Sequence, residues 1–375
     1  MNLERLVERL RDYRLENKRF DRLVGTVLSS ERGAKAVRSF VATARSISRR
    51  RQTLSPGDYD TVFFVAGEMR SGTSWLRHSL SDHPEIACGQ EGSFFGRDYD
   101  HEEIPVYAEP VSSLTRALAV SKDLETWHGL PWNLWSDDYE EDLRALSRLS
   151  VDYFLSKEVA RTGRRIVGDK SPQHTENLDE IHEIYPDARI IHIVRDGRDV
   201  AVSSMHHWWR LSKDRGGVFE LTPEELRLRD EYAEDRQGFL ASGRSIFTEG
   251  RLVQLARRWD RRTGKARRDG STLYGERYLE IRYEDLLLDT PAVFGRVLEF
   301  LGASSEDRVI ERCLRSSDFT RASSRRQGEE NSASFFRKGV AGDWRDVFTK
   351  RDRNLYKGLA GDRLIELGYE SSHDW

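Results

Sequence analysis

An apolar run that leads into a glycine turn, residues 61–75, constrains the fold more than any other part of this 375-residue chain. The run reads Thr-Val-Phe-Phe-Val-Ala and is typical of a strand that is buried on both faces. Gly67 and Gly72 then follow the G-x-x-x-x-G spacing of a phosphate-binding loop, and a helix should start directly after them. The next two residues are Thr and Ser, where a nucleotide triphosphatase carries Lys and Ser or Thr, and the cation inside the loop is Arg70. The pattern therefore predicts a phosphate loop for a ligand other than a triphosphate with magnesium.

Strand-like and helical runs alternate along the rest of the chain. We expect strands at 62–66, 165–169, 188–195 and 278–282, and helices between them, for instance at 141–157 and 176–185. Short apolar strands joined by helical crossovers predict an α/β fold of the P-loop type, with three layers and a mostly parallel central sheet. Ligands of such sheets bind at the carboxyl ends of the strands. The glycine loop and the segment 195–203 should therefore lie together.

The first residues differ from the rest in composition. Residues 1–51 contain fourteen Lys/Arg and six Asp/Glu, and their apolar residues recur at helical spacing. We therefore expect a basic helical extension over 1–54 before a domain that spans 55–375. This extension either packs on the domain with a solvated basic face or binds a membrane surface or a partner. The sequence does not decide between these roles.

A polar, interrupted stretch at 211–250 is predicted to be a lid over the substrate or a surface insertion. Within it, Thr222, Pro223 and Glu225 have the pattern of a helix start with an N-cap, a proline and a capping-box glutamate. Residues 315–334 are rich in Ser, Arg, Gln and Glu and are predicted to form a loop.

The bulk composition excludes several classes of protein. The net charge is −3, so the chain as a whole is not a nucleic-acid binder by charge. Cys88 and Cys313 are the only cysteines, which excludes a disulfide framework and a cysteine zinc site and fits a reducing compartment. No apolar run approaches the roughly 18–20 residues of a membrane span. The N-terminus lacks the apolar core of a secretory signal. We therefore expect a soluble cytoplasmic protein.

Four segments, in order along the chain, resemble the sulfotransferases that use 3′-phosphoadenosine 5′-phosphosulfate (PAPS). They are Arg-Ser-Gly-Thr-Ser-Trp at 70–75, the strand and helix start at 190–204, Arg-Tyr-Glu-Asp-Leu at 282–286, and Phe-Arg-Lys-Gly-Val-Ala-Gly-Asp-Trp at 336–344. One such segment alone is a weak signal, but four in order over roughly residues 60–350 are specific. The resemblance implies an enzyme that transfers the sulfuryl group of PAPS to a hydroxyl group and requires no metal.

The resemblance also implies which residues hold the cofactor. They are Arg70, Ser71, Gly72, Thr73, Ser74, Trp75, Arg195, Ser203, Tyr283, Arg337, Lys338 and Gly339. Backbone amides and hydroxyls of the first loop would grip the 5′-phosphosulfate, and an anion without Mg²⁺ needs a cation such as Arg70. Family members often carry lysine there, whereas arginine can only stabilise charge.

By the same resemblance, Arg195 and Ser203 clamp the 3′-phosphate, and the Arg-Lys-Gly of 337–339 closes over it. Without the resemblance, Arg195 could belong to a turn held by its own ion pairs. Trp75 either stacks on adenine or anchors its helix in the core. Tyr283 contacts the nucleotide or simply follows the end of a strand.

The predicted base lies in Gly-Gln-Glu-Gly-Ser-Phe-Phe at 89–95, which resembles the Lys-Glu-x-x-Phe-Phe segment of the carbohydrate sulfotransferase branch. In that branch the glutamate deprotonates the acceptor hydroxyl, and Glu91 occupies its position. The alternative is a solvated loop carboxylate. The branch lysine is Gln90 here, but Lys170, in a segment that resembles the branch's Glu-Lys-Thr/Ser-Pro, could supply that cation. His174, just beyond it, is predicted to contact the acceptor.

Two alternative functions stay open on the sequence alone. A P-loop kinase of a small hydroxyl substrate is disfavoured because residue 73 is not lysine and because Arg-Lys-Gly has no role on ATP. A PAPS-binding protein without transfer activity stays open because Gln90, Ser93 and Arg70 depart from the branch pattern.

The Glu91 resemblance favours a carbohydrate or related small-molecule acceptor. The aromatic segment 127–135 either stacks on the acceptor or belongs to the core. The oligomeric state is not indicated, and a homodimer is compatible with the sequence.

Overall fold

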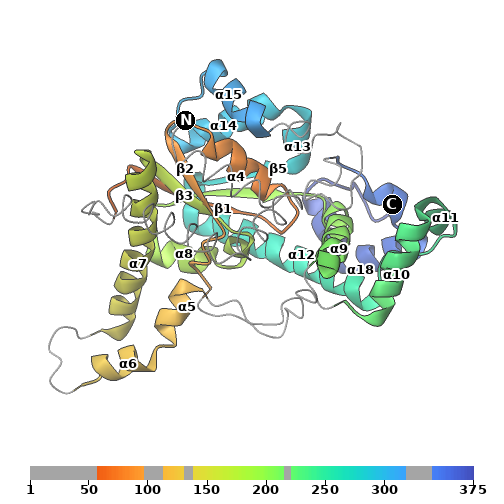
Figure 1. Ribbon diagram of the computed structural model, residues 1–375, viewed down its shortest axis with the longest axis horizontal. Helices are drawn as coiled ribbons and strands as arrows, with labels where there is room; N and C mark the ends of the chain where they lie inside the picture. Colours follow the sequence, from red (N-terminus) through yellow and green to blue (C-terminus); the bar gives the residue numbers. More distant parts are fainter. Residues whose placement is uncertain (1–56, 97–112, 131–137, 215–220, 318–339) are drawn as a thin grey trace, which may run out of the picture. The chain divides into compact units, whose positions relative to one another are not determined.

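The computed structural model describes residues 57–96, 113–130, 138–214, 221–317 and 340–375 (Figure 1). The strands are β1 (Thr61–Ala66), β2 (Ile86–Gln90), β3 (Ile166–Lys170), β4 (Arg189–Val194) and β5 (Tyr278–Arg282). The helices are α4 (Thr73–Ser81), α5 (Leu114–Ala119), α6 (Lys122–His128), α7 (Tyr139–Thr162), α8 (Leu178–Ile184), α9 (Gly197–Asp214), α10 (Pro223–Glu234), α11 (Arg236–Ala241), α12 (Glu249–Asp269), α13 (Tyr283–Leu288), α14 (Thr290–Leu301), α15 (Asp307–Ser317), α17 (Trp344–Val347) and α18 (Lys350–Glu366). Shorter helical turns are η2 (Pro172–Glu176), η3 (Gly270–Tyr274) and η4 (Gly275–Arg277).

The five strands form one sheet in the order β2-β3-β1-β4-β5, and every pair is parallel. The predicted α/β fold with a mostly parallel central sheet is therefore confirmed. The four expected strands agree with the observed ones to within one residue at each end. The sequence analysis missed β2, because Ile-Ala-Cys-Gly-Gln has no sustained apolar run. Since all strands run the same way, their carboxyl ends lie at one edge of the sheet.

Both faces of the sheet are covered by helices. Phe63 and Val65 of β1 pack on one side with side chains of α4, α14 and α15, while Val62 and Phe64 pack on the other with α7 and α8. Figure 1 shows α4, α14 and α15 on one side of the strands and α8 and α12 on the other. This alternation along β1 explains why its sequence is apolar at successive positions.

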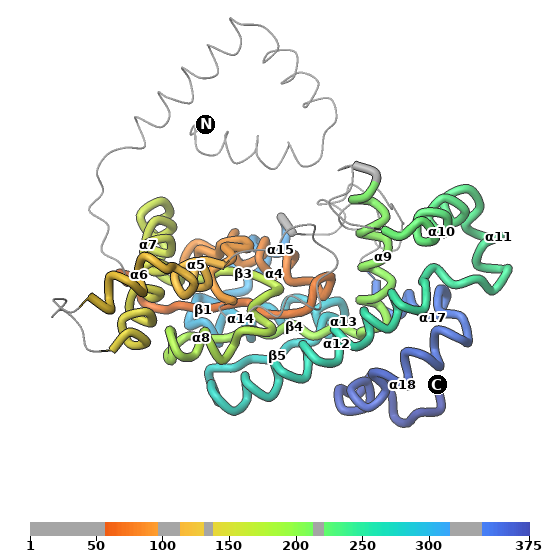
Figure 2. The backbone as a smooth tube through the Cα atoms, turned by 90° about the horizontal axis from the view of Figure 1, so that it is seen from below, coloured from red at the N-terminus to blue at the C-terminus, as the bar shows by residue number. Residues whose placement is uncertain are grey.

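A third apolar core lies beside the sheet, built from α9–α12, α17 and α18 around Trp208, Trp259 and Tyr356. The helices α12 and α18 pack against each other in it (Figure 2). The described part of the stretch 211–250 contributes buried side chains to this core. Its role as a lid stays a prediction.

The predicted helix start in that stretch is confirmed. Thr222 caps α10, its side chain accepts from the amide of Glu225, and its own amide donates to the Glu225 carboxylate at 2.8 Å. Pro223 occupies the first position of the helix. This start follows from local side-chain chemistry, so the sequence was enough to locate it.

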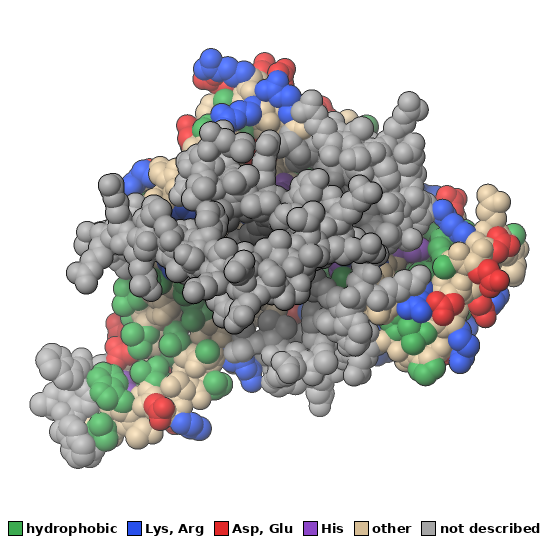
Figure 3. All heavy atoms as spheres, viewed as in Figure 1, with side chains coloured by type: hydrophobic (Ala, Val, Ile, Leu, Met, Phe, Trp, Pro, Cys, Tyr) green, Lys and Arg blue, Asp and Glu red, His purple; other side chains and the backbone are tan. Residues whose placement is uncertain are grey.

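Exposed large apolar side chains of the described residues gather on α6 and α7, in the lower left of Figure 3. They include Trp127, Leu146, Leu149, Tyr153 and Phe154. Of the aromatic segment 127–135, Trp127 is 49% exposed and so does not belong to the core, while residues 131–135 lie outside the described ranges. The expected extension 1–54 and most of the predicted loop 315–334 also lie outside them. Among the described helices, none has the length and apolarity needed to cross a bilayer.

Candidate active site

Every strand of the sheet leads into a residue or loop that the sequence analysis singled out. In sheet order, these are Glu91 after β2, Lys170 at the end of β3, the loop 67–72 after β1, Arg195 after β4 and Tyr283 after β5. Because the strands are parallel, all five positions lie at the edge where sheets of this kind bind ligands. The candidate site is therefore a product of the sheet topology.

The glycine loop 67–72 is shaped by unusual backbone angles. Gly72 has φ of 95°, and a Cβ atom there would lie 2.6 Å from a ring carbon of Tyr283. Arg70 is also left-handed, with φ of 72°. The helix α4 starts directly after Gly72 without a side-chain cap, so a bound anion can take the place of the cap.

Replacing Gly72 with alanine is expected to lower the free energy of unfolding by roughly 2–4 kcal/mol, because the left-handed angle and the clash with Tyr283 act together. Gly163→Ala is the matched control, since Gly163 has φ of 70° but nothing within 4 Å of its would-be Cβ. The control should lose only the backbone contribution of about 1–2 kcal/mol. Urea denaturation measures both, and equal losses would show that the Tyr283 contact is unimportant.

Arg70 and Arg195 meet although 125 positions separate them in the chain. Arg195 Nη1 donates to the Arg70 carbonyl at 2.9 Å, and Arg70 Nε donates to Ser203 Oγ at 3.2 Å. The Arg195 guanidinium lies over the Tyr283 ring, 4.4 Å from its centroid. Four residues that the sequence analysis assigned to the cofactor, from three separate segments, are thus in mutual contact.

The segment 340–344 is tied to the same cluster. Arg195 Nη2 donates to the carbonyl of Val340 at 3.0 Å. The buried Asp199 carboxylate accepts from two backbone amides of the segment, at 2.7 and 3.0 Å, and burial raises the pKa of this carboxyl group. The Arg-Lys-Gly of 337–339 comes directly before Val340 but lies outside the described residues, so its contact with phosphate stays a prediction.

Lys170 joins the predicted base to the residues that follow the glycine loop. Its side chain is fully buried, and Nζ donates to Glu91 Oε1 at 2.5 Å and to Ser74 Oγ at 3.4 Å. The Glu91 side chain is 52% exposed, so its carboxylate can be reached from solvent. The cation that Gln90 does not supply is therefore present beside Glu91 from the neighbouring strand.

The hydroxyl residues and the tryptophan of the segment 70–75, which spans the end of the glycine loop and the start of α4, differ in burial. Ser71 and Thr73 are buried, and Ser71 Oγ has no hydrogen-bond partner among the described residues. The same holds for Arg195 Nε. Buried polar atoms of this kind fit a ligand oxygen. Trp75 packs, partly buried, against the core of α4 and α14, as its anchoring role requires, and its stacking on adenine stays a prediction.

His174 lies in the core rather than on a surface that an acceptor could reach. It is 1% exposed, and its Nδ1 donates to the Val65 carbonyl at 3.2 Å. Its ring packs edge-on against Phe64 and Phe95. Burial lowers the pKa of His174 to about 3, so the ring is neutral. The predicted acceptor contact finds no support in this placement and stays a prediction.

Glu68, a buried carboxylate inside the glycine loop, was not predicted as a functional residue from the sequence. It forms ion pairs with Arg258 at 3.0 Å and Arg262 at 3.3 Å, both from α12. Burial alone would raise the pKa of Glu68, but the two arginines outweigh it and lower the pKa. The loop is thereby tethered to α12. A glutamate in a phosphate loop needs such cations, and the i, i+4 spacing of the arginines was a usable signal.

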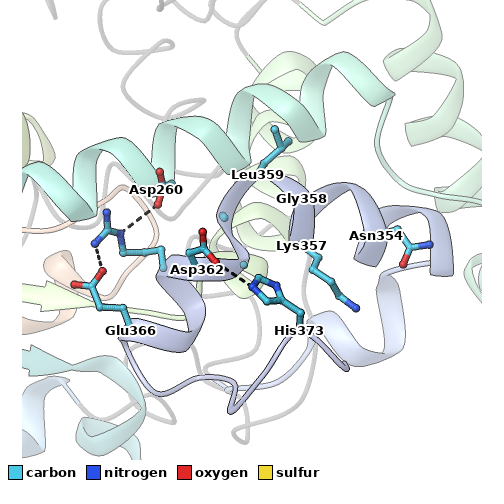
Figure 4. A pocket seen from close by; sticks show the side chains of 11 residues that line it. Asp260, Asn354, Lys357, Gly358, Leu359, Asp362, Glu366 and His373 are labelled. Carbon is cyan, nitrogen blue, oxygen red and sulfur yellow. Dashed lines mark hydrogen bonds and ion pairs between the residues drawn. The ribbon is translucent and has the colours of Figure 1, made fainter.

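A hollow with a volume of about 700 Å³ lies along α18 next to α12, away from the strand ends (Figure 4). Arg363 pairs there with Asp260 at 3.2 Å and with Glu366, and His373 pairs with Asp362 at 3.0 Å. None of the residues assigned to the cofactor or the acceptor lines it. The strand ends are therefore the better candidate site.

Comparisons with known proteins relate this chain to one enzyme family. Residues 63–248 match the model of the Sulfotransferase family. The nodulation protein NoeE of Sinorhizobium fredii is 28% identical over 153 residues, which are 39% of this chain and 32% of that protein. Sulfotransferase 2A2 of Rattus norvegicus is 25% identical over 186 residues, 47% of this chain and 56% of that protein. The chain thus spans about a third of the length of NoeE and somewhat over half of the length of sulfotransferase 2A2.

Solved structures with a similar arrangement include the mouse sulfotransferase SULT7A1 complexed with PAP, at 17% identity, with a TM-score of 0.46 and coverage of 82% of this chain and 86% of that one. Another is sulfotransferase STF9 from Mycobacterium avium, at 14% identity, with a TM-score of 0.44 and coverage of 86% and 80%. At these TM-scores the assignment depends on the family model and not on the two structures. By that match, residues 63–248 of this chain belong to the sulfotransferase family.

Proposed function

We propose that this protein transfers the sulfuryl group of PAPS to a hydroxyl group of a carbohydrate or related small molecule. The observation that carries the proposal is the convergence of Glu91, Lys170, the glycine loop, Arg195 and Tyr283 at the ends of five adjacent strands. Membership of the sulfotransferase family supports it. The carbohydrate acceptor is supported by the resemblance of the Glu91 segment to that branch.

The cations of the site suit a ligand with two separate anionic groups. Arg195 and Ser203, at the end of β4 and on α9, would bind the 3′-phosphate. Arg70 and the amides at the start of α4 would bind the 5′-phosphosulfate. The buried Ser71 Oγ and Arg195 Nε, which lack partners among the described residues, fit oxygens of these groups.

The reaction we propose is an in-line displacement at sulfur. Glu91 takes the proton of the acceptor hydroxyl while the acceptor oxygen bonds to sulfur and the bond from sulfur to the phosphate oxygen breaks. Arg70 and Lys170 stabilise the negative charge that grows on the sulfuryl and leaving phosphate oxygens. The products are a sulfate ester and adenosine 3′,5′-bisphosphate (PAP). The contacts of Lys170 with both Glu91 and Ser74 support its place between base and loop.

Calorimetric titration of the purified protein with PAP, and separately with ATP plus Mg²⁺, tests the cofactor. Micromolar binding of PAP that does not depend on magnesium is the expected result. Preference for Mg–ATP would overturn the proposal in favour of a kinase.

Incubation with PAPS and a panel of sugars, amino sugars and phenols then tests the acceptor. Transfer to sugar hydroxyls is expected. Transfer to phenols alone would overturn the carbohydrate assignment, and PAP binding without transfer to any member would indicate a binding protein.

A further inference from the structure

The turn that carries Glu91 adopts an unfavourable backbone. Glu91 and Ser93 have φ of 51° and 49°, in the left-handed region that non-glycine residues rarely adopt. Residues with such angles persist only when their surroundings hold them in place. Groups around the turn at Glu91 must therefore hold it in this conformation.

Asp169 is the side chain that holds this turn. The amide of Gly92 donates to both of its carboxylate oxygens, at 3.2 and 3.3 Å. Asp169 lies on β3 directly opposite Gly89 of β2, where a Cβ atom would come within 2.8 Å of the carboxylate. The turn is fixed on its other side by the amide of Glu91, which donates to the Lys170 carbonyl at 2.7 Å.

The carboxylate of Asp169 is itself fixed in a buried setting. It is 2% exposed, and its Oδ2 lies 3.6 Å from His174 Nε2. Because His174 donates from Nδ1 to a backbone carbonyl, the lone pair of the neutral ring faces the carboxylate. Burial raises the pKa of Asp169 to about 6, while Lys170 and Arg77 oppose the rise and Glu91 adds to it. The surroundings of Asp169 therefore disfavour its ionised form.

We propose that Asp169 is a positioning residue, whose hydrogen bond to the Gly92 amide holds the Glu91 carboxylate beside Lys170 and the phosphate loop. Asp169 does not touch the reacting atoms. It acts by restricting the turn to the conformation in which Glu91 can accept the acceptor proton. This inference rests on the proposed function only for the role of Glu91 as the base. The hydrogen bond between Asp169 and the Gly92 amide is present in the protein without any ligand.

Two variants separate positioning from simple stability. Asp169→Ala removes the acceptor for the Gly92 amide. Asp169→Asn keeps an oxygen for that amide and can also donate to His174 Nε2, so it should preserve the turn. It should also raise the Tm at pH 7.5, because the wild-type carboxylate favours its proton in the folded state, and this gain should shrink as the pH falls from 6 toward 4.

Hydrogen–deuterium exchange of residues 88–96 in the full-length protein without added ligand gives a readout that needs neither PAP nor an acceptor. Faster exchange in Asp169→Ala and wild-type exchange in Asp169→Asn are expected. If the alanine variant does not fold, Asp169→Ser replaces it, because its hydroxyl is too short to reach the amide. Wild-type exchange in Asp169→Ala, or in Asp169→Ser where that replaces it, would overturn the proposal.

Turnover is measured on the acceptor that the panel identifies. In Asp169→Ala or Asp169→Ser, kcat should fall about tenfold, while the KM for PAPS and the Kd for PAP stay unchanged. In Asp169→Asn, kcat should stay within about threefold of the wild-type value. An equal loss in the asparagine variant would overturn positioning by this hydrogen bond. Failure of the wild-type protein to bind PAP would instead refute the proposed function, and the exchange experiment would still decide the role of Asp169 in the turn.

Discussion

Replacing Glu91 with glutamine is expected to lower kcat by roughly 10²–10⁴-fold, the usual contribution of a general base. Glutamine has nearly the same shape but cannot take the acceptor proton, and it leaves the buried Lys170 without its anion. The Kd for PAP should change little, because Glu91 is not among the residues assigned to the nucleotide. Steady-state kinetics on the identified acceptor, together with calorimetry, measures the two quantities separately.

The matched control is Glu125→Gln, which also breaks an ion pair between a glutamate and a lysine. Glu125 pairs with Lys122 at 3.2 Å, and both side chains are mostly exposed on α6. Pairs of this kind contribute little to stability, and Glu125 is not among the residues assigned to the site, so kcat should stay at the wild-type value. A Glu91→Gln enzyme as active as the wild type would show that the base is another group.

Replacing Arg195 with alanine is expected to weaken PAP binding by roughly 10- to 100-fold, which is the effect of losing a charge-assisted hydrogen bond of about 1.5–3 kcal/mol. The variant also loses the bonds that join the loop at Arg70 to the segment at Val340. At saturating PAPS, kcat should fall much less than affinity, because this side chain is assigned to the 3′-phosphate. Calorimetric titration with PAP measures the change.

Arg189→Ala is the control for Arg195→Ala. Arg189 begins the same strand at its opposite end, and its Nη1 donates to the Phe300 carbonyl at 2.6 Å. This control should bind PAP as the wild type does, even if it is somewhat less stable. If Arg195→Ala also binds PAP normally, the cluster of Arg70, Arg195 and Ser203 is a structural turn and the phosphate site lies elsewhere.

The features that could be predicted from the sequence are those whose causes are local. The strand before the glycine loop and the capping box of α10 each depend on residues a few positions apart, so the sequence contains their causes. It failed for β2, whose five residues lack an apolar pattern of their own. That strand forms because β3 offers it a parallel edge, with Ile86 opposite Ile166 and Gln90 opposite Lys170.

The sequence by itself determined the class of fold, the position of the glycine loop between β1 and α4, and the resemblance to sulfotransferases. The tertiary structure alone decided which groups meet: Lys170 with Glu91 across 79 positions, and Glu68 with Arg262 across 194. It also decided that His174 is a core residue and that Asp169 holds the turn at Glu91. The physical reason is the sequence distance over which each kind of interaction acts. Backbone preferences and caps act over a few residues, whereas ion pairs and burial depend on the strand order, which places distant segments at one edge of the sheet.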